Sequence, residues 1–239
     1  MRIVLNPKYQ RLESYIKQID EHFEQEGREI HRGRNVLRVL QVDGLTLVVK
    51  RYGRMPLSNR IATRIYKSNK AKNAYIRPLL LKERGFESPE PVAFVTYREN
   101  WLNATHYFVC LHSNYRYTMA DIDTLDVAFR TEVIEAFARY AAHLHKNGFL
   151  HRDFSAGNIL FDRVGSRIHF ALIDTNSMKC GRAVSVEKGC QNFARLQGNP
   201  DFFKQLGTLY AQHRNADAAY CIDQIQKGHH AYLVRKGLA

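Results

Sequence analysis

The sequence predicts an α+β protein of two lobes, a small and mostly antiparallel β lobe followed by a mostly helical lobe. Short runs rich in β-branched residues, separated by turn residues, occur in the first half at residues 36–42, 45–49, 92–97 and 106–111. From residue 126 onward, apolar residues recur at helical spacing. A chain of 239 residues is long enough for each lobe to bury a core. We place the lobes at residues 1–112 and 113–239, with 113–124 as their connection.

The chain is expected to begin with a helix. Asn6 and Pro7 suit an N-cap and a first helical position, and Gly27 suits the end of the helix. An apolar stripe runs along it, formed by Leu12, Tyr15, Ile16, Ile19 and Phe23. Its polar face is acidic and carries Glu13, Asp20, Glu21, Glu24 and Glu26. An acidic face disfavours a membrane surface, so this helix is expected to dock on the body of the lobe.

Asp43-Gly44 separates the first two predicted strands and is a strong hairpin signal, because both residues tolerate the left-handed backbone of a tight turn. Lys50 is expected to end the second strand. The next stretch, 51–82, contains no Asp or Glu and is strongly basic. Helices are predicted at 61–66 and 71–81, with Pro78 forcing a kink or a late start.

Two interpretations of the basic stretch remain open. It is either a solvated surface or a landing surface for a phosphate-rich substrate or a membrane. In the second case we expect Arg60, Arg64, Lys67 and Lys70 to carry the binding, which would weaken steeply with added salt.

The second lobe is predicted to open with a helix at 126–147 that ends at Asn147-Gly148. Strands at 159–161 and 168–173 then form a hairpin around the polar turn 162–166. The remainder is mostly helical in pattern, and its aromatic and aliphatic residues are expected to form a core.

The formal net charge of +13 favours polyanionic partners such as nucleotides, phosphorylated glycolipids or an anionic membrane surface. Nucleic acid is not expected, because no nucleic-acid-binding motif stands out. No apolar run approaches the roughly 18 residues of a membrane span. The N-terminus turns polar too soon for a secretory signal. The four cysteines show no Cys-x-x-Cys spacing and are expected to be reduced thiols.

His151, Asp153 and Asn158 match the His-x-Asp-x-x-x-x-Asn catalytic loop of kinases, and Asp174 after the hairpin matches their second metal ligand. In such loops the Asp accepts the proton of the substrate hydroxyl and the Asn holds a metal ion. Phosphoryl transfer spreads charge over the transferred group, so it requires Mg²⁺ and an oriented hydroxyl. Asn and Asp supply the hard oxygen ligands that Mg²⁺ prefers. The alternative is a buried, hydrogen-bonded His beside a helix end, with Asp and Asn in surface turns.

Val48-Val49-Lys50 fits the strand lysine that reaches the phosphates of ATP in kinases. No Gly-x-Gly-x-x-Gly accompanies it. No Ala-Pro-Glu follows Asp174, and the remaining chain is short for the substrate-docking lobe of a eukaryotic-type protein kinase. These absences point away from a peptide substrate.

Taken together, the chain resembles the bacterial lipopolysaccharide kinase family of the heptose and Kdo kinase type, which are small relatives of protein kinases. The similarity is most specific at 151–160, with softer matches at 6–9, 33–36, 49–52, 88–93 and 173–176. The resemblance implies a two-lobed protein-kinase-like fold. It also implies an ATP- and Mg²⁺-dependent enzyme that phosphorylates a sugar of the lipopolysaccharide core, in the cytoplasm and peripheral to the inner membrane. Asp153 would be the catalytic base, Asn158 and Asp174 the metal ligands, and Lys50 the phosphate-binding lysine.

The chain departs from kinases in two respects that bear on activity. Kinases pair the strand Lys with a helix Glu, but Ile76 stands near that place and Glu83 is the first carboxylate, two helical turns further on. Thr175-Asn176 also stands where protein kinases have Phe-Gly. One alternative is therefore a catalytically weak pseudokinase that binds nucleotide, and an anionic lipid or polyanion through its basic face.

Another alternative is a kinase of the aminoglycoside or choline type. Those enzymes usually carry Gly where Arg152 stands here, and their clefts tend to be acidic, so the basic balance of this chain disfavours that class. The sequence does not indicate which sugar hydroxyl is the acceptor or what the oligomeric state is.

Overall fold

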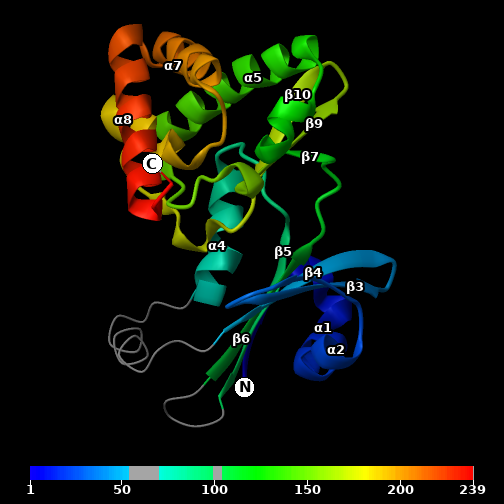
Figure 1. Ribbon diagram of the computed structural model, residues 1–239. Coiled ribbons are helices and arrows are strands. Elements are labelled where there is room, and N and C mark those ends of the chain that lie inside the picture. The colour runs from blue at the N-terminus through cyan, green and yellow to red at the C-terminus, as the bar shows by residue number, and fades with distance from the viewer. Residues whose placement is uncertain (54–69, 99–103, 239) are drawn as a thin grey trace. The chain divides into compact units, whose positions relative to one another are not determined.

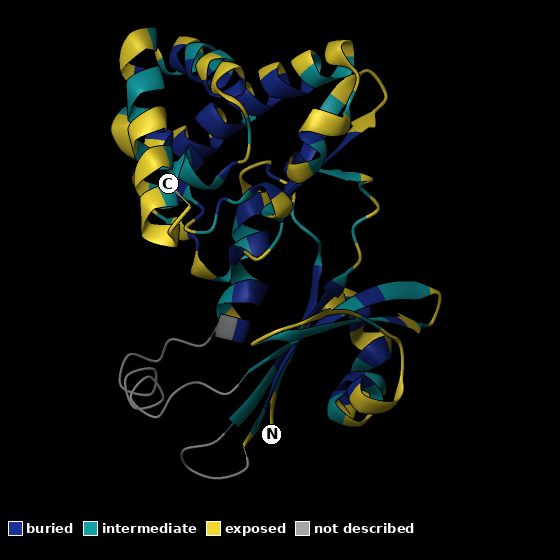
Figure 2. Ribbon diagram, in the orientation of Figure 1, coloured by how far each residue is buried: buried dark blue, intermediate teal, exposed yellow. Residues whose placement is uncertain are grey.

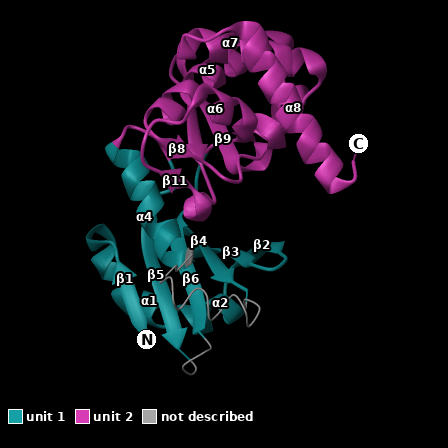
Figure 3. Cartoon of the chain, turned by 90° about the vertical axis from the view of Figure 1, so that its left-hand side faces the viewer, with its two compact units in different colours: residues 1–83, 88–114 teal, residues 84–87, 115–239 magenta. Residues whose placement is uncertain are grey.

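The computed structural model describes residues 1–53, 70–98 and 104–238 (Figure 1). The chain divides into two compact units (Figure 3). Unit 1 comprises residues 1–83 and 88–114, and unit 2 comprises residues 84–87 and 115–239. An antiparallel sheet dominates unit 1 and helices dominate unit 2, which confirms the predicted α+β class.

Unit 1 contains a six-stranded sheet in the order β1-β5-β6-β4-β3-β2, with antiparallel neighbours throughout. The four predicted strands are all present, and the Asp43-Gly44 turn has the expected positive φ angles of 48° and 73°. The strands are β1 (Arg2–Leu5), β2 (Arg28–Arg32), β3 (Val36–Val42), β4 (Leu45–Tyr52), β5 (Pro91–Arg98) and β6 (Ala104–Leu111).

The expectation that Lys50 ends its strand was wrong. Strand β4 continues to Tyr52, because Arg51 and Tyr52 still pair with Tyr107 and His106 of β6. Lys50 therefore lies within a paired strand rather than at its frayed end.

The N-terminal segment packs on one face of this sheet, as predicted, although it is not a single helix. It consists of η1 (Pro7–Leu12), α1 (Glu13–Lys17) and α2 (Ile19–Gln25), interrupted where Gln18 leaves the helical conformation. Asn6 caps it, accepting a hydrogen bond from the backbone N–H of Lys8 at 3.1 Å. The apolar stripe from Leu12 to Phe23 is buried in one cluster with residues of β3 to β6.

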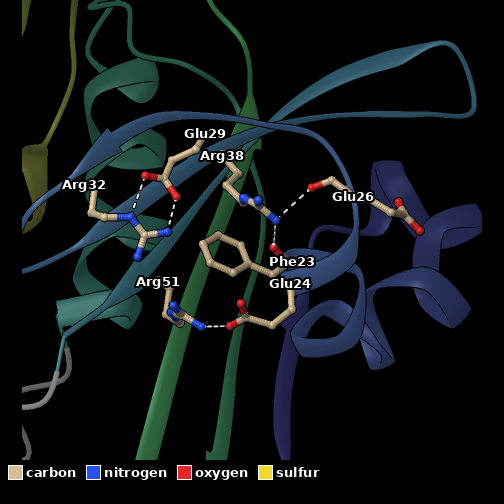
Figure 4. Close-up of polar contacts among 7 residues, drawn as sticks. All are labelled: Phe23, Glu24, Glu26, Glu29, Arg32, Arg38 and Arg51. Atoms are coloured by element: carbon tan, nitrogen blue, oxygen red, sulfur yellow. Dashed lines mark hydrogen bonds and ion pairs between the residues drawn. The ribbon is translucent and has the colours of Figure 1, made fainter.

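Two arginines of the sheet meet the acidic helical segment around Phe23 (Figure 4). Arg51 forms an ion pair with Glu24, and Arg38 donates to the backbone carbonyls of Phe23 and Glu26. Their guanidinium groups lie 4.8 Å and 5.7 Å from the centre of the Phe23 ring. These polar and cation–π contacts add to the apolar contacts through which the segment docks.

The other face of the sheet is covered by α4 (Lys70–Glu83), which contacts β5 and β6. Pro78 lies inside this helix, so it did not delay the start of the helix. Ala71 and Tyr75 of α4 pack with Phe94 of β5 in a second apolar cluster. The helix predicted at 61–66 lies outside the described residues.

Unit 2 is built around α5 (Val127–Lys146), which is buried along much of its length (Figure 2). Asp126 caps its start by accepting from the N–H of Phe129 at 2.9 Å, and Gly148 follows its end with a φ of 80°. Small sheets pair β10-β9-β7 and β11-β8. Their strands are β7 (Tyr117–Thr118), β8 (Phe149–Leu150), β9 (Ile159–Val164), β10 (Arg167–Leu172) and β11 (Lys179–Cys180).

The C-terminal part is helical, as predicted, with α6 (Val186–Asn192), α7 (Pro200–Arg214) and α8 (Ala218–Lys236). Short 3₁₀ turns complete the unit: η2 (Met119–Thr124), η3 (Ala156–Asn158), η4 (Thr175–Ser177) and η5 (Phe193–Arg195). The core forms where α5 and α7 meet, and its aromatic members include Phe137, Phe154, Phe193 and Tyr210. None of the helices in residues 1–53, 70–98 and 104–238 is long and apolar enough to cross a membrane.

Candidate active site

The loop from His151 to Asn158, called the catalytic loop below, joins β8 to β9. Phe154 anchors it, since its ring is fully buried and stacks near Phe137 of α5. The side chain of Asp153 retains 43% of its exposure, so its carboxylate can reach a substrate. The buried ring of Phe154 thus fixes the loop, while the neighbouring carboxylate of Asp153 stays accessible.

His151 is fully buried and holds the loop together. The N–H of Asp153 donates to Nδ1 of His151 at 3.2 Å. Nε2 of His151 therefore carries the proton and donates to the carbonyl of Ile173 at 3.0 Å. Burial is the main cause that lowers the pKa of His151, in keeping with a neutral ring. His151 therefore has a structural role that ties Asp153 to the residue before Asp174.

Asn158 and Asp174 meet the same loop from the other side. The amide nitrogen of Asn158 donates to the carbonyl of Asp153 at 2.9 Å, and the N–H of Ile173 donates to the carbonyl of Asn158 at 3.0 Å. Asp174 has φ 54° and ψ 42°, the left-handed conformation that Asp and Asn tolerate best among side-chain-bearing residues. Asn176 donates to its carboxylate. Hydrogen bonds thus bring the loop with Asp153 and Asn158 together with the strand end at Asp174.

These residues fit a magnesium ion. Because the amide nitrogen of Asn158 donates to the loop, its carbonyl oxygen is the atom that would serve as a ligand, and Asp174 would add a carboxylate. In the part of the chain that the structure describes, no three or more His, Cys, Asp or Glu side chains gather as a metal site. Magnesium needs only one or two protein ligands when substrate phosphates and water complete its shell.

Arg195 is a site residue that the sequence did not reveal. It lies in η5 and forms an ion pair with the carboxylate of Asp153. Its guanidinium group also lies 5.7 Å from the centre of the Tyr232 ring of α8. Arg195 follows Asp153 by 42 residues and belongs to no motif, so no local signal could have connected them.

A chain of hydrogen bonds reaches the catalytic loop from α7. Arg214 donates to the hydroxyl of Tyr210 at 2.6 Å, and this hydroxyl is 2.8 Å from Nδ1 of His145. Nε2 of His145 is 3.1 Å from the amide oxygen of Asn192, whose nitrogen donates to the carbonyl of His151 at 2.9 Å. Since Asn192 donates through its nitrogen, its oxygen accepts from Nε2, and Nδ1 of His145 accepts from Tyr210. Burial lowers the pKa of His145 to about 4, which keeps the ring neutral.

Lys50 lies on β4 in unit 1. Its side chain is nearly buried, at 8% exposure, and its Nζ lies 5.3 Å from the centre of the Tyr52 ring. Lys50 pairs with Phe108 of β6, and both Tyr52 and Phe108 pack in the apolar cluster beneath α4. Lys50 thus lies on the face of β4 that α4 covers, and its role as the phosphate-binding lysine stays a prediction.

The helix above this face offers no glutamate at the expected place. Ile76 packs in the same apolar cluster, and Glu83 is exposed at the last position of α4. The departure noted in the sequence therefore holds for the described part of this helix.

The basic stretch is only partly described. Arg60, Arg64 and Lys67 lie outside the described residues, as does the side chain of Lys70. Of the residues that are described, Arg51 is paired with Glu24. The landing surface stays a prediction.

Comparison with known proteins bears on the identity of the chain. A family model described as the lipopolysaccharide kinase (Kdo/WaaP) family matches residues 80–205, which include Asp153, Asn158, Asp174 and Arg195. A solved structure of WaaP in complex with acyl carrier protein matches with a TM-score of 0.63 and 16% sequence identity. The match covers 97% of this chain and 99% of that one, and it supports the predicted kinase-like fold. Among curated proteins, no relative matches the chain. Because the family model spans more than half of its length, the chain belongs to the lipopolysaccharide kinase (Kdo/WaaP) family and is a phosphotransferase that acts on a sugar hydroxyl.

Proposed function

We propose that the chain transfers a phosphoryl group from ATP to a sugar hydroxyl of the lipopolysaccharide core or of a related anionic glycolipid. The observation that carries the proposal is the hydrogen-bonded arrangement of the catalytic loop, in which Asn158 contacts Asp153 and the strand end before Asp174. Family membership supports the acceptor class. The net charge of +13 suits an anionic acceptor and a cytoplasmic site at the inner membrane, with peripheral contact to anionic lipids.

In this proposal Asp153 is the base. Its partly exposed carboxylate accepts the proton of the attacking hydroxyl, and its backbone is fixed by His151 and Asn158. Asn158 and Asp174 hold Mg²⁺, which neutralises charge on the phosphates of ATP when bound. Lys50 is the phosphate-binding lysine in this proposal.

Arg195 supplies a positive charge at the base. The catalytic loop itself carries no cation between Asp153 and Asn158, and Arg195, through its ion pair with Asp153, brings a positive charge beside the reacting hydroxyl. A fixed cation near developing negative charge lowers the barrier for phosphoryl transfer.

The test measures Mg²⁺-dependent ATP consumption and transfer to purified core glycolipid. Asp153→Ala and Asp174→Asn should each abolish transfer, and the second keeps the left-handed backbone of residue 174. Asp201→Ala, which removes an exposed carboxylate on α7, is the matched control and should behave as wild type.

Retained turnover in folded Asp153→Ala protein would refute the assigned base. Nucleotide binding without transfer in the wild type, with core glycolipid present, would instead identify a pseudokinase. Because the similar WaaP structure contains acyl carrier protein, co-purification with that protein is a further test of partners.

A further inference from the structure

A basic pocket lies within unit 2 directly beside the catalytic loop. Its volume is about 700 Å³. Four separate elements each place one cation in its wall: Arg152 of the catalytic loop, Lys179 of β11, Arg182 of the following loop and Lys188 of α6. Among residues 1–53, 70–98 and 104–238, no carboxylate lines it.

These four cations lack the ion pairs that some other cations of unit 2 form. Arg116, Arg163 and Arg195 form ion pairs with Asp162, Glu132 and Asp153. Within the described residues, by contrast, none of the four pocket cations forms an ion pair. Like charges that converge without counter-charge repel one another, and a bound anion would remove that repulsion.

The walls of the pocket are fixed by backbone hydrogen bonds. The N–H of Gly181 donates to the carbonyl of Gly148 at 3.1 Å, and that of Val184 donates to the carbonyl of His145 at 2.9 Å. Contact at Gly148 is so close that a Cβ there would lie 2.0 Å from the carbonyl oxygen of Gly181. The backbone that carries the cations is therefore fixed before binding, so the entropy cost of binding falls on the exposed side chains alone.

The pocket is also connected to the reacting centre. Arg152 immediately precedes Asp153 in the chain. Asn192, which lines the pocket, donates to the carbonyl of His151 at 2.9 Å. A ligand in the pocket would thus contact the elements that carry the proposed base.

We propose that this pocket is a phosphate subsite, which binds a phosphate group of the acceptor glycolipid while its hydroxyl is presented to Asp153. This inference rests on the proposed function for the identity of the acceptor. Lysine and arginine are the side chains that bind phosphate groups most strongly, and their number here suits a doubly charged ester.

The test is an equilibrium binding measurement without ATP, so that it does not depend on turnover. The probe is a fluorescently labelled, phosphate-bearing core oligosaccharide, compared with the same oligosaccharide after phosphatase treatment. The variant is Arg182→Gln with Lys188→Gln, which leaves Arg152 and the catalytic loop unchanged. The control is Lys204→Gln with Lys236→Gln, two exposed cations away from the pocket that give the same change in net charge.

We expect the Arg182/Lys188 variant to bind the phosphate-bearing probe at least about 10-fold more weakly than wild type, because hydrogen bonds to charged groups are lost. The control should bind as wild type, and all three proteins should bind the phosphatase-treated probe equally. Competition by inorganic phosphate in wild type alone would show that the pocket accepts phosphate from either source.

Equal weakening in the variant and the control would overturn the inference, since it would reflect only net charge. Equal affinity of wild type for both probes would overturn it as well. If wild type binds as expected and transfers nothing, the proposed function fails and the subsite stands.

Discussion

Tyr210→Phe tests whether the hydrogen bonds between α7 and the catalytic loop hold the second unit together. The hydroxyl of Tyr210 is completely buried; it donates to Nδ1 of His145 and accepts from Arg214. Its removal leaves a buried acceptor nitrogen unsatisfied, which costs about 1–3 kcal/mol. Arg214 keeps its bond to the carbonyl of Val184. We therefore expect the free energy of unfolding to fall by about 2–3 kcal/mol, near the upper part of that range.

The assay is urea denaturation of the wild type and Tyr210→Phe, with Tyr220→Phe as the control. Tyr220 is 43% exposed, so loss of its hydroxyl should change the midpoint little. The dependence on urea should be the same in all three proteins, because the surface exposed on unfolding does not change. Equal midpoints for Tyr210→Phe and Tyr220→Phe would refute the reasoning.

Two further predictions follow from the same part of the molecule. Arg195→Gln should lower kcat for transfer roughly 10-fold or more and leave KM for ATP unchanged, and Arg195→Lys should recover part of the kcat. Steady-state kinetics measure both parameters. An unchanged kcat in the Gln variant would show that Arg195 has no role in transfer. The free energy of unfolding should fall as pH is lowered from 6.5 toward 4. In this range His145 becomes protonated in the unfolded chain but stays neutral in the folded chain, where burial lowers its pKa to about 4. The difference between the pKa of His145 in the unfolded chain and in the folded chain corresponds to about 3 kcal/mol at 1.36 kcal/mol per pKa unit. Burial also lowers the pKa of His151, so His151 contributes to the same loss of stability at low pH. Urea titrations across this range measure it, and a flat profile would contradict the assignment of a neutral His145.

Much of the fold could be predicted because local patterns specify it. Alternating and helical apolar periods indicated β3 to β6 and α5, and Asp43-Gly44 indicated the hairpin between β3 and β4. Strands β1 and β2 were missed because they are short, and β2 has four exposed residues of five, so no buried alternation marks it. The break at Gln18 was missed because its apolar neighbours keep a helical period on both sides.

The candidate site, like the fold, could be predicted from the sequence only in part. Asp153, Asn158 and Asp174 could be proposed as site residues from the sequence because a motif fixes their spacing within a short segment. Arg195 and the partners of His145 could not be found, since 42, 47 and 65 residues separate the contacting pairs. Only the folded chain brings such side chains together.

The hydrogen bonds from Arg214 to the catalytic loop can run in only one donor-to-acceptor direction. Arginine can only donate at one end, and the backbone carbonyl of His151 can only accept at the other. Neither the tautomer of His145 nor the amide of Asn192 can be reversed without losing a bond, so no second arrangement of equal energy exists. A bistable element is what conformational switching requires. This set of hydrogen bonds therefore supplies no second state between which the backbone at His151 could switch.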